Sequence, residues 1–297
     1  MSYTTSVKEI LCHKNSDPCC KRAELYGFLL FSGIFSKEKI SFRSENSFVI
    51  KRYEDIFHSL NFVNYEKYER NNKTVNYFIE INEENTEDLI KKIGDVIVGP
   101  PLRIDYSAFD NDCCAAAFLR GVFIGGGFIC SPEKSYHLEI RTGHQMLADD
   151  LIRFAVEYDI HLKSVLRNGI RILYIKTSEQ IKDFLAYIGA STSVFDFVNA
   201  ELEKSLNNNV NRVVNCEQAN IEKSVNAAQK QIKAITRLKK KGYINMSPEL
   251  IALAEARLQH PEMTLEQLGK ELTPELSKSG VAHRMKKITD LTKKKGK

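Results

Sequence analysis

Four of the seven cysteines in this 297-residue chain form two vicinal pairs, Cys19-Cys20 and Cys113-Cys114. Cysteine thiolates can bind metal ions, but zinc sites are typically built on C-x₂₋₄-C spacing. No two cysteines in this sequence have that spacing, and their total number is odd. We therefore expect reduced thiols in a reducing cytoplasm, with no disulfide framework, no metal site and no cofactor.

A second group of candidate residues lies near the C-terminus, where basic side chains could contact nucleic acid. Residues 207–297 include 18 Lys and Arg against 9 Asp and Glu, whereas the rest of the chain has 25 basic and 29 acidic residues. This asymmetry indicates a nucleic-acid partner bound at one end, although a solvated basic face would give the same charge. Arginine can pair bidentately with guanine, and lysines can hold phosphates. The candidate DNA-binding residues are Lys278, Ser279, His283, Arg284, Lys286 and Lys287.

The segments that carry the cysteine pairs are repeats of each other. Cys19–Gly33 and Cys113–Gly127 share two cysteines, an alanine, a leucine and two glycines at a constant offset of 94 residues. A fixed offset over this many identities indicates a duplicated unit, and such units pack on each other.

Both copies have the same predicted order of elements, αββαββα. In the first copy we expect helices at 19–33, 53–61 and 84–94, and strands at 34–42, 47–52, 62–70 and 74–81. In the second copy we expect helices at 112–125, 143–158 and 178–189, and strands at 127–130, 135–141, 161–167 and 170–176. The dipeptide Asn168-Gly169 predicts a tight hairpin turn between the last two strands.

The C-terminal third predicts helices alone. A long helix is expected at 217–241, after the asparagine run 207–209, and a second at 248–259 with Ser247 as its N-cap. Thr264 and Gln267 form a capping box that opens a helix to Leu272, and a last helix covers 278–292. These last two helices resemble a helix-turn-helix with a long turn. The last helix has an inward apolar face of Val281, Met285, Ile288 and Leu291.

The expected fold class is α+β, a duplicated αββαββα domain followed by an all-α domain. We place the two halves at 1–98 and 99–206, a linker and long helix at 207–242, and the helix-turn-helix domain at 243–297. No apolar run is long enough to span a bilayer, and the N-terminus has no secretory signal, so no membrane partner is expected.

Residues Phe118–Ile129 resemble the signature helix of LAGLIDADG homing endonucleases. In that family two such helices pack at a pseudo-twofold axis, and each delivers an acidic residue to a metal site. The matching positions here are Ser32, a neutral hydroxyl, and Gly126, which has no side chain. Glu24 lies eight residues before Ser32, roughly 12 Å along a helix, too far to substitute. The resemblance therefore implies a nuclease scaffold without catalytic residues, and no enzyme activity.

The whole chain resembles the WhiA family of bacterial regulators, which join a degenerate LAGLIDADG domain to a helix-turn-helix. The resemblance is carried by Cys19–Leu25, Pro132–Ile140, Asn211–Ile221 and Lys278–Arg284. It implies a cytoplasmic, nucleoid-associated protein that binds double-stranded DNA and regulates transcription in cell division and chromosome segregation, and in sporulating relatives sporulation. The net negative charge of the N-terminal part implies that its strand faces have lost their contact with DNA or gained a protein co-regulator.

Two alternatives remain open at the level of sequence. The chain could be a metal-dependent DNA endonuclease with acids recruited from elsewhere in the fold. It could also be a partner-binding platform whose basic end contacts DNA nonspecifically, with an affinity that collapses in salt.

Overall fold

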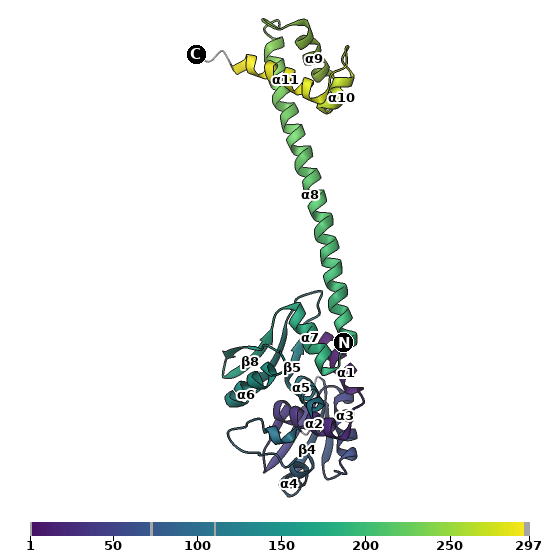
Figure 1. Cartoon of the computed structure of the whole chain (residues 1–297), viewed down its shortest axis with the longest axis vertical. Coiled ribbons are helices and arrows are strands. Elements are labelled where there is room, and N and C mark those ends of the chain that lie inside the picture. The colour runs from purple at the N-terminus through teal and green to yellow at the C-terminus, as the bar shows by residue number, and fades with distance from the viewer. Residues whose placement is uncertain (1, 72–73, 110, 294–297) are drawn as a thin grey trace. The chain divides into compact units, whose positions relative to one another are not determined.

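The computed structural model describes residues 2–71, 74–109 and 111–293. These residues form two compact units that divide between Glu203 and Lys204, inside helix α8 (Ser191–Lys239) (Figure 1). The domain ranges expected from the sequence also include residues 1, 72–73, 110 and 294–297, which lie outside the described residues. Within the described residues, no helix combines the length and the apolar character that crossing a membrane requires.

The N-terminal unit contains the predicted αββαββα order twice. The first copy consists of α2 (Pro18–Ser32), β1 (Gly33–Phe35), β2 (Lys39–Ser44), α3 (Ser47–Ser59), β3 (Glu66–Asn71), β4 (Val75–Asn82) and α4 (Glu83–Lys92). The second consists of α5 (Asp112–Gly126), β5 (Gly127–Ile129), β6 (Leu138–Thr142), α6 (Gln145–Val156), β7 (Lys163–Arg167), β8 (Ile170–Ile175) and α7 (Ser178–Ile188). The antiparallel sheets have matching strand orders, β1-β2-β4-β3 and β5-β6-β8-β7, which confirms the duplication.

The strands of the first copy differ from the prediction in two places. Residues 34–42, predicted as one strand, contribute to two strands, β1 and β2. Residues 47–52 form the start of α3, not a strand, because Val49, Ile50 and Tyr53 share one buried helical face with Ile56 and Phe57. The alternating pattern of these residues had suggested a strand, but burial against the core decided the conformation. Helix α1 (Tyr3–Cys12) was not predicted, since only three of its residues are buried.

Helices α2 and α5 pack against each other in the core of the N-terminal unit (Figure 1). A Cβ atom placed on Gly121 would lie 1.9 Å from the Glu24 carbonyl oxygen, and one on Gly27 would lie 2.3 Å from the Phe118 carbonyl oxygen. Real Cβ atoms do not approach an oxygen so closely, so the two backbones touch only because both positions are glycine.

The C-terminal unit is all-α, as predicted, and is built around the last turns of α8. Helices α9 (Pro248–Gln259), α10 (Leu265–Lys270) and α11 (Lys278–Lys293) complete it. The short 3₁₀ helix η1 (Tyr106–Ala108) belongs to the N-terminal unit. Its core comprises Ile235, Leu238, Leu253, Ala254, Leu268, Val281, Met285 and Ile288. Gly242 follows α8 with a left-handed φ of 69°, in agreement with the predicted helix end.

Helix α8 is much longer than the predicted 217–241. It continues through the asparagine run 207–209, because residues 191–239 contain no glycine or proline and asparagine lowers helix stability only modestly. Of the apolar residues Ile221, Val225 and Ile235 along this helix, Ile235 at the C-terminal end is buried, whereas Ile221 and Val225 are 58% and 49% exposed.

The α2–α5 contact predicts that Gly121→Ala destabilises the N-terminal unit by about 3 kcal/mol, because the added methyl group has no room between the backbones. Gly143→Ala is the matched control, since a Cβ there meets nothing within 4 Å. Urea unfolding followed by circular dichroism measures both. Equal midpoints for the two variants would contradict the close packing.

Candidate nucleic-acid interface

Helices α10 and α11 are joined by a long turn that a backbone contact closes. The Leu276 amide donates to the Gly269 carbonyl at 3.0 Å, and a Cβ on Gly269 would lie 2.0 Å from the Leu276 carbonyl oxygen. The predicted capping box is present at the start of α10: the Gln267 amide donates to Thr264 Oγ1 at 3.3 Å, and the Thr264 amide donates to Gln267 Oε1 at 2.9 Å. The backbone contact holds the turn before α11 against α10, and the capping box defines where α10 begins.

Helix α11 separates apolar from polar side chains. Val281, Met285 and Ile288 are buried, as predicted. At about 100° per residue, Ser279, His283 and Lys286 lie on the opposite side of the helix, and Lys278 and Lys287 lie nearer its flanks. All five of these candidate residues are exposed.

Arg284 differs from the other candidate residues. Its side chain is 29% exposed and forms an ion pair with Glu249 of α9, with 3.1 Å between Nη2 and Oε2. Because the Glu249 side chain is 70% exposed, water screens this pair, and it contributes little to stability. Arg284 therefore lies at the edge of the exposed surface of α11, partly engaged by its own domain.

A buried arginine orders the loop that leads into α10. Arg257 is 2% exposed and donates from Nη1 to the Met263 carbonyl at 2.6 Å, with longer contacts at 3.4 Å to the carbonyls of His260 and Pro261. Burial lowers the pKa of its guanidinium from the usual value. This role could not be predicted from sequence, because it depends on where the loop folds back in the structure.

Each sheet of the N-terminal unit packs one face on helices and leaves the other open. On the first sheet Arg70 lies over the stacked rings of Tyr68 and Phe78, at 5.1 Å from each centroid. On the second, burial acts to raise the pKa of Glu139, but hydrogen bonds from His137 and Arg141 outweigh it and hold that pKa below the usual range.

Strand register gives the charge of these open faces. The open face of the first sheet has the basic residues Lys39, Arg43 and Arg70 and the acidic residues Glu66 and Glu80. The open face of the second has the basic residues Arg141, Lys163 and Arg167 and the acidic residue Glu139. Basic side chains thus outnumber acidic ones on both faces. The net negative charge of the N-terminal part therefore resides elsewhere on its surface.

The two positions that correspond to nuclease acids lie at the C-terminal ends of α2 and α5. A Cβ placed on Gly125, beside Gly126, would lie 3.3 Å from the Ser32 Cβ, so these two ends adjoin. The Ser32 hydroxyl is buried and has no hydrogen-bond partner among the residues that the structure describes, and a Cβ on Gly126 would lie 3.0 Å from the Arg141 carbonyl oxygen. Among the described residues, no grouping of three or more carboxylates or histidines is arranged to bind an ion.

Comparison with known proteins places these features in one family. The chain matches the model of the WhiA LAGLIDADG-like domain over residues 115–207 and the WhiA C-terminal HTH domain over 210–292. It is 36% identical to the probable cell division proteins WhiA of Ruminiclostridium cellulolyticum and Carboxydothermus hydrogenoformans, in each case over 99% of this chain and 98% of the relative. The chain belongs to the WhiA family. The crystal structure of full-length DUF199/WhiA from Thermotoga maritima shares its fold, with a TM-score of 0.60, 25% identity and full coverage of both chains.

In this WhiA-family chain, Glu24, the acid nearest to Ser32 within α2, is part of a buried ion-pair network. Glu24 is fully buried and accepts from Arg52 at 2.9 and 2.8 Å and from Arg120 at 2.9 Å. Arg120 also donates to the carbonyl of Ile188 at 3.1 Å and to Ser16 Oγ at 3.0 Å. Burial acts to lower the pKa of Arg52, but the hydrogen bond and charge of Glu24 outweigh it and raise that pKa. Glu24 thus forms ion pairs with two arginines and links α2 to α3 and α5.

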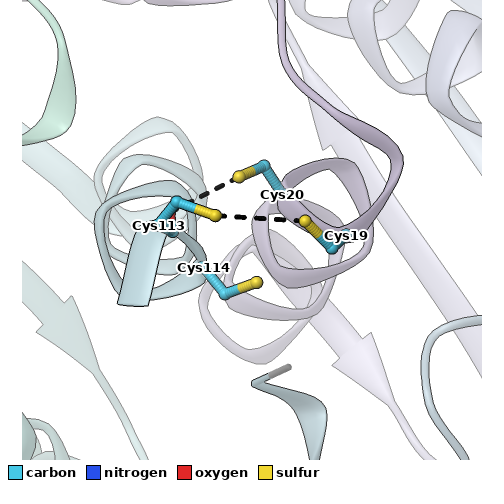
Figure 2. Close-up of side chains that lie close together, drawn as sticks. All are labelled: Cys19, Cys20, Cys113 and Cys114. Atoms are coloured by element: carbon cyan, nitrogen blue, oxygen red, sulfur yellow. Dashed lines mark hydrogen bonds between the residues drawn. The ribbon is translucent and has the colours of Figure 1, made fainter. Parts of the chain in front are cut away.

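The structure also brings together residues that sequence spacing had set aside. The two vicinal cysteine pairs meet at the N-terminal ends of α2 and α5, with Cys19 Sγ 4.0 Å from Cys113 Sγ (Figure 2). The 94-residue offset was the signal that could have found them. Residues related by the duplication face each other where the two helices lie close to the pseudo-twofold axis that relates the copies.

Replacing Glu24 by glutamine is expected to destabilise the N-terminal unit by about 3 kcal/mol, because two largely buried arginines lose their counter-charge. Glu87→Gln provides the comparison. That residue pairs with Lys91 on the surface of α4, and its loss is expected to change the unfolding free energy by less than about 0.5 kcal/mol. If chemical denaturation gives similar losses for both variants, the buried triad does not have the assigned structural role.

Proposed function

We propose that this chain is a sequence-specific DNA-binding protein that regulates transcription in cell division, with α11 as its reading helix. The observation that carries this proposal is the row of exposed Ser279, His283 and Lys286 opposite the buried face of α11. The proposed process is cell division because its WhiA relatives are named probable cell division proteins. In sporulating relatives the same activity would serve sporulation.

The chemistry of α11 suits the major groove of double-stranded DNA. That groove admits a helix and presents donors and acceptors that distinguish the base pairs. The Ser279 hydroxyl, the His283 ring and the Lys286 ammonium can hydrogen-bond to base edges, while Lys278 and Lys287 on the flanks can hold phosphates. Arg284 can reach a guanine by releasing Glu249, an exposed pair that costs little to break.

We further infer that the LAGLIDADG-like domain does not hydrolyse DNA. Metal-dependent phosphodiester cleavage needs hard cations held by carboxylate oxygens. The family's two acid positions are occupied by Ser32 and Gly126, and the nearest acid in α2, Glu24, is paired with arginines. The protein would then act as a DNA-binding protein at the nucleoid, in the cytoplasm. Plasmid DNA incubated with it and Mg²⁺ or Mn²⁺ should remain intact.

The open sheet faces favour a second role in binding a negatively charged surface. Arg70, stacked on Tyr68 and Phe78, is held in place, and Arg141, Lys163 and Arg167 supply further positive charge. Such a surface suits either flanking DNA backbone or an acidic protein co-regulator. If an acidic protein still co-purifies with the chain after nuclease treatment has removed bridging DNA, that protein is the co-regulator.

Removing two positive charges from α11 tests the reading helix. For the full chain, Lys286→Ala with Lys287→Ala should weaken binding to a duplex recovered from genomic DNA by roughly 10- to 100-fold, as loss of one base and one phosphate contact requires. Lys91→Ala with Lys92→Ala removes the same charge from α4 and should leave the affinity within about twofold. Fluorescence anisotropy at fixed salt measures both. A similar loss in the two variants would show nonspecific attraction and overturn the proposal.

A further inference from the structure

The four vicinal cysteines form a compact cluster between the two halves of the LAGLIDADG-like domain. Cys19 and Cys20 lie in the first turn of α2, and Cys113 and Cys114 in the first turn of α5. Their four Sγ atoms all lie within 4.8 Å of one another, and Figure 2 shows the side chains converging between the helix ends. Cys20 Sγ also donates to the Cys113 carbonyl oxygen at 3.5 Å.

The spacing of the sulfurs fits one metal ion. In a tetrahedral tetrathiolate with metal–sulfur bonds of about 2.3 Å, the sulfurs are roughly 3.8 Å apart. Cys19 and Cys113 are already 4.0 Å apart, and all four sulfurs lie within 4.8 Å of one another, so side-chain rotations that shorten the sulfur–sulfur distances by about 1 Å or less complete the geometry. An iron–sulfur cluster distributes its thiolates over several irons and needs a wider cage.

The ends of the two helices suit a negatively charged metal centre. The N-cap residues, Asp17 of α2 and Asn111 of α5, make no side-chain capping hydrogen bonds. First-turn N–H groups and the positive ends of two helix dipoles therefore face the thiolates, which such positions stabilise. Lys14 and Arg120 line an adjoining cavity of about 450 Å³ together with Cys20 and Cys113, which gives an ion a route to the sulfurs.

We propose that Cys19, Cys20, Cys113 and Cys114 bind one Zn²⁺ ion as a structural tetrathiolate centre. Each half of the duplicated domain supplies two ligands, so the ion cross-links the halves at the end of the helix pair opposite Ser32 and Gly126. Four protein ligands fill a tetrahedral zinc ion, which leaves no open position for catalysis. The expectation of no zinc rested on spacing within one segment, whereas here two segments 94 residues apart each contribute an adjacent pair.

Metal analysis of the full chain tests this site. Protein purified under reducing conditions, incubated with Zn²⁺ and desalted, should retain one zinc per chain by mass spectrometry. Co²⁺ in place of Zn²⁺ should give the visible absorption bands of a tetrahedral tetrathiolate. The double variant Cys19→Ser with Cys113→Ser should lose both the zinc and these bands. Cys130→Ser with Cys216→Ser, which replaces two cysteines outside the cluster, should keep them.

A second measurement separates loss of the ligand from loss of the fold. Zn²⁺ should raise the thermal midpoint of the wild-type chain and of the Cys130/Cys216 variant, and a chelator should reverse the shift. The Cys19/Cys113 variant should unfold cooperatively with a midpoint that Zn²⁺ does not change. The proposal is overturned if the wild-type chain retains no zinc, if the Cys19/Cys113 variant retains as much as the wild type, or if a Cys19–Cys113 disulfide forms under the same reducing conditions.

Discussion

The backbone contact between α2 and α5 determines the arrangement of the N-terminal unit. With Gly27 and Gly121 at the crossing, no side chain separates the helices, so each half must place its sheet in an equivalent position. The same contact brings matching ends together: Ser32 adjoins Gly125 at one end, and the four cysteines meet at the other. Between them the buried Glu24 forms ion pairs with Arg52 and Arg120, so the centre of the pair is structural.

Much of this arrangement could be predicted because it is encoded locally or by repetition. The constant offset of 94 residues predicts two copies of one fold, and both copies have the same sheet order. The capping box at Thr264 and the apolar spacing from Val281 to Ile288 predict α10 and α11 to within two residues. The lack of a side-chain metal ligand at Gly126 could be predicted directly, since it depends on the residue type alone.

The remaining features depend on contacts between distant residues. Residues 47–52 have a strand-like composition, yet burial of Val49 and Ile50 on the core makes them helical. The ion pair of Arg284 with Glu249 and the loop contacts of Arg257 require the folded positions of α9 and α11. The charge of the open sheet faces follows from strand register, which overall net charge does not reveal. The cysteine cluster likewise exists only after the two halves have packed.

These features divide the chain into a duplicated scaffold and a helical domain for which we propose DNA reading. Selection of binding sites from random DNA by the full chain, with Mg²⁺ present, tests this account most directly. The account predicts one recurring motif, intact DNA, and a changed or weakened motif when Ser279 and His283 of α11 are replaced by alanine. Recovery of the same motif at the same strength by that variant would show that α11 does not read the sequence.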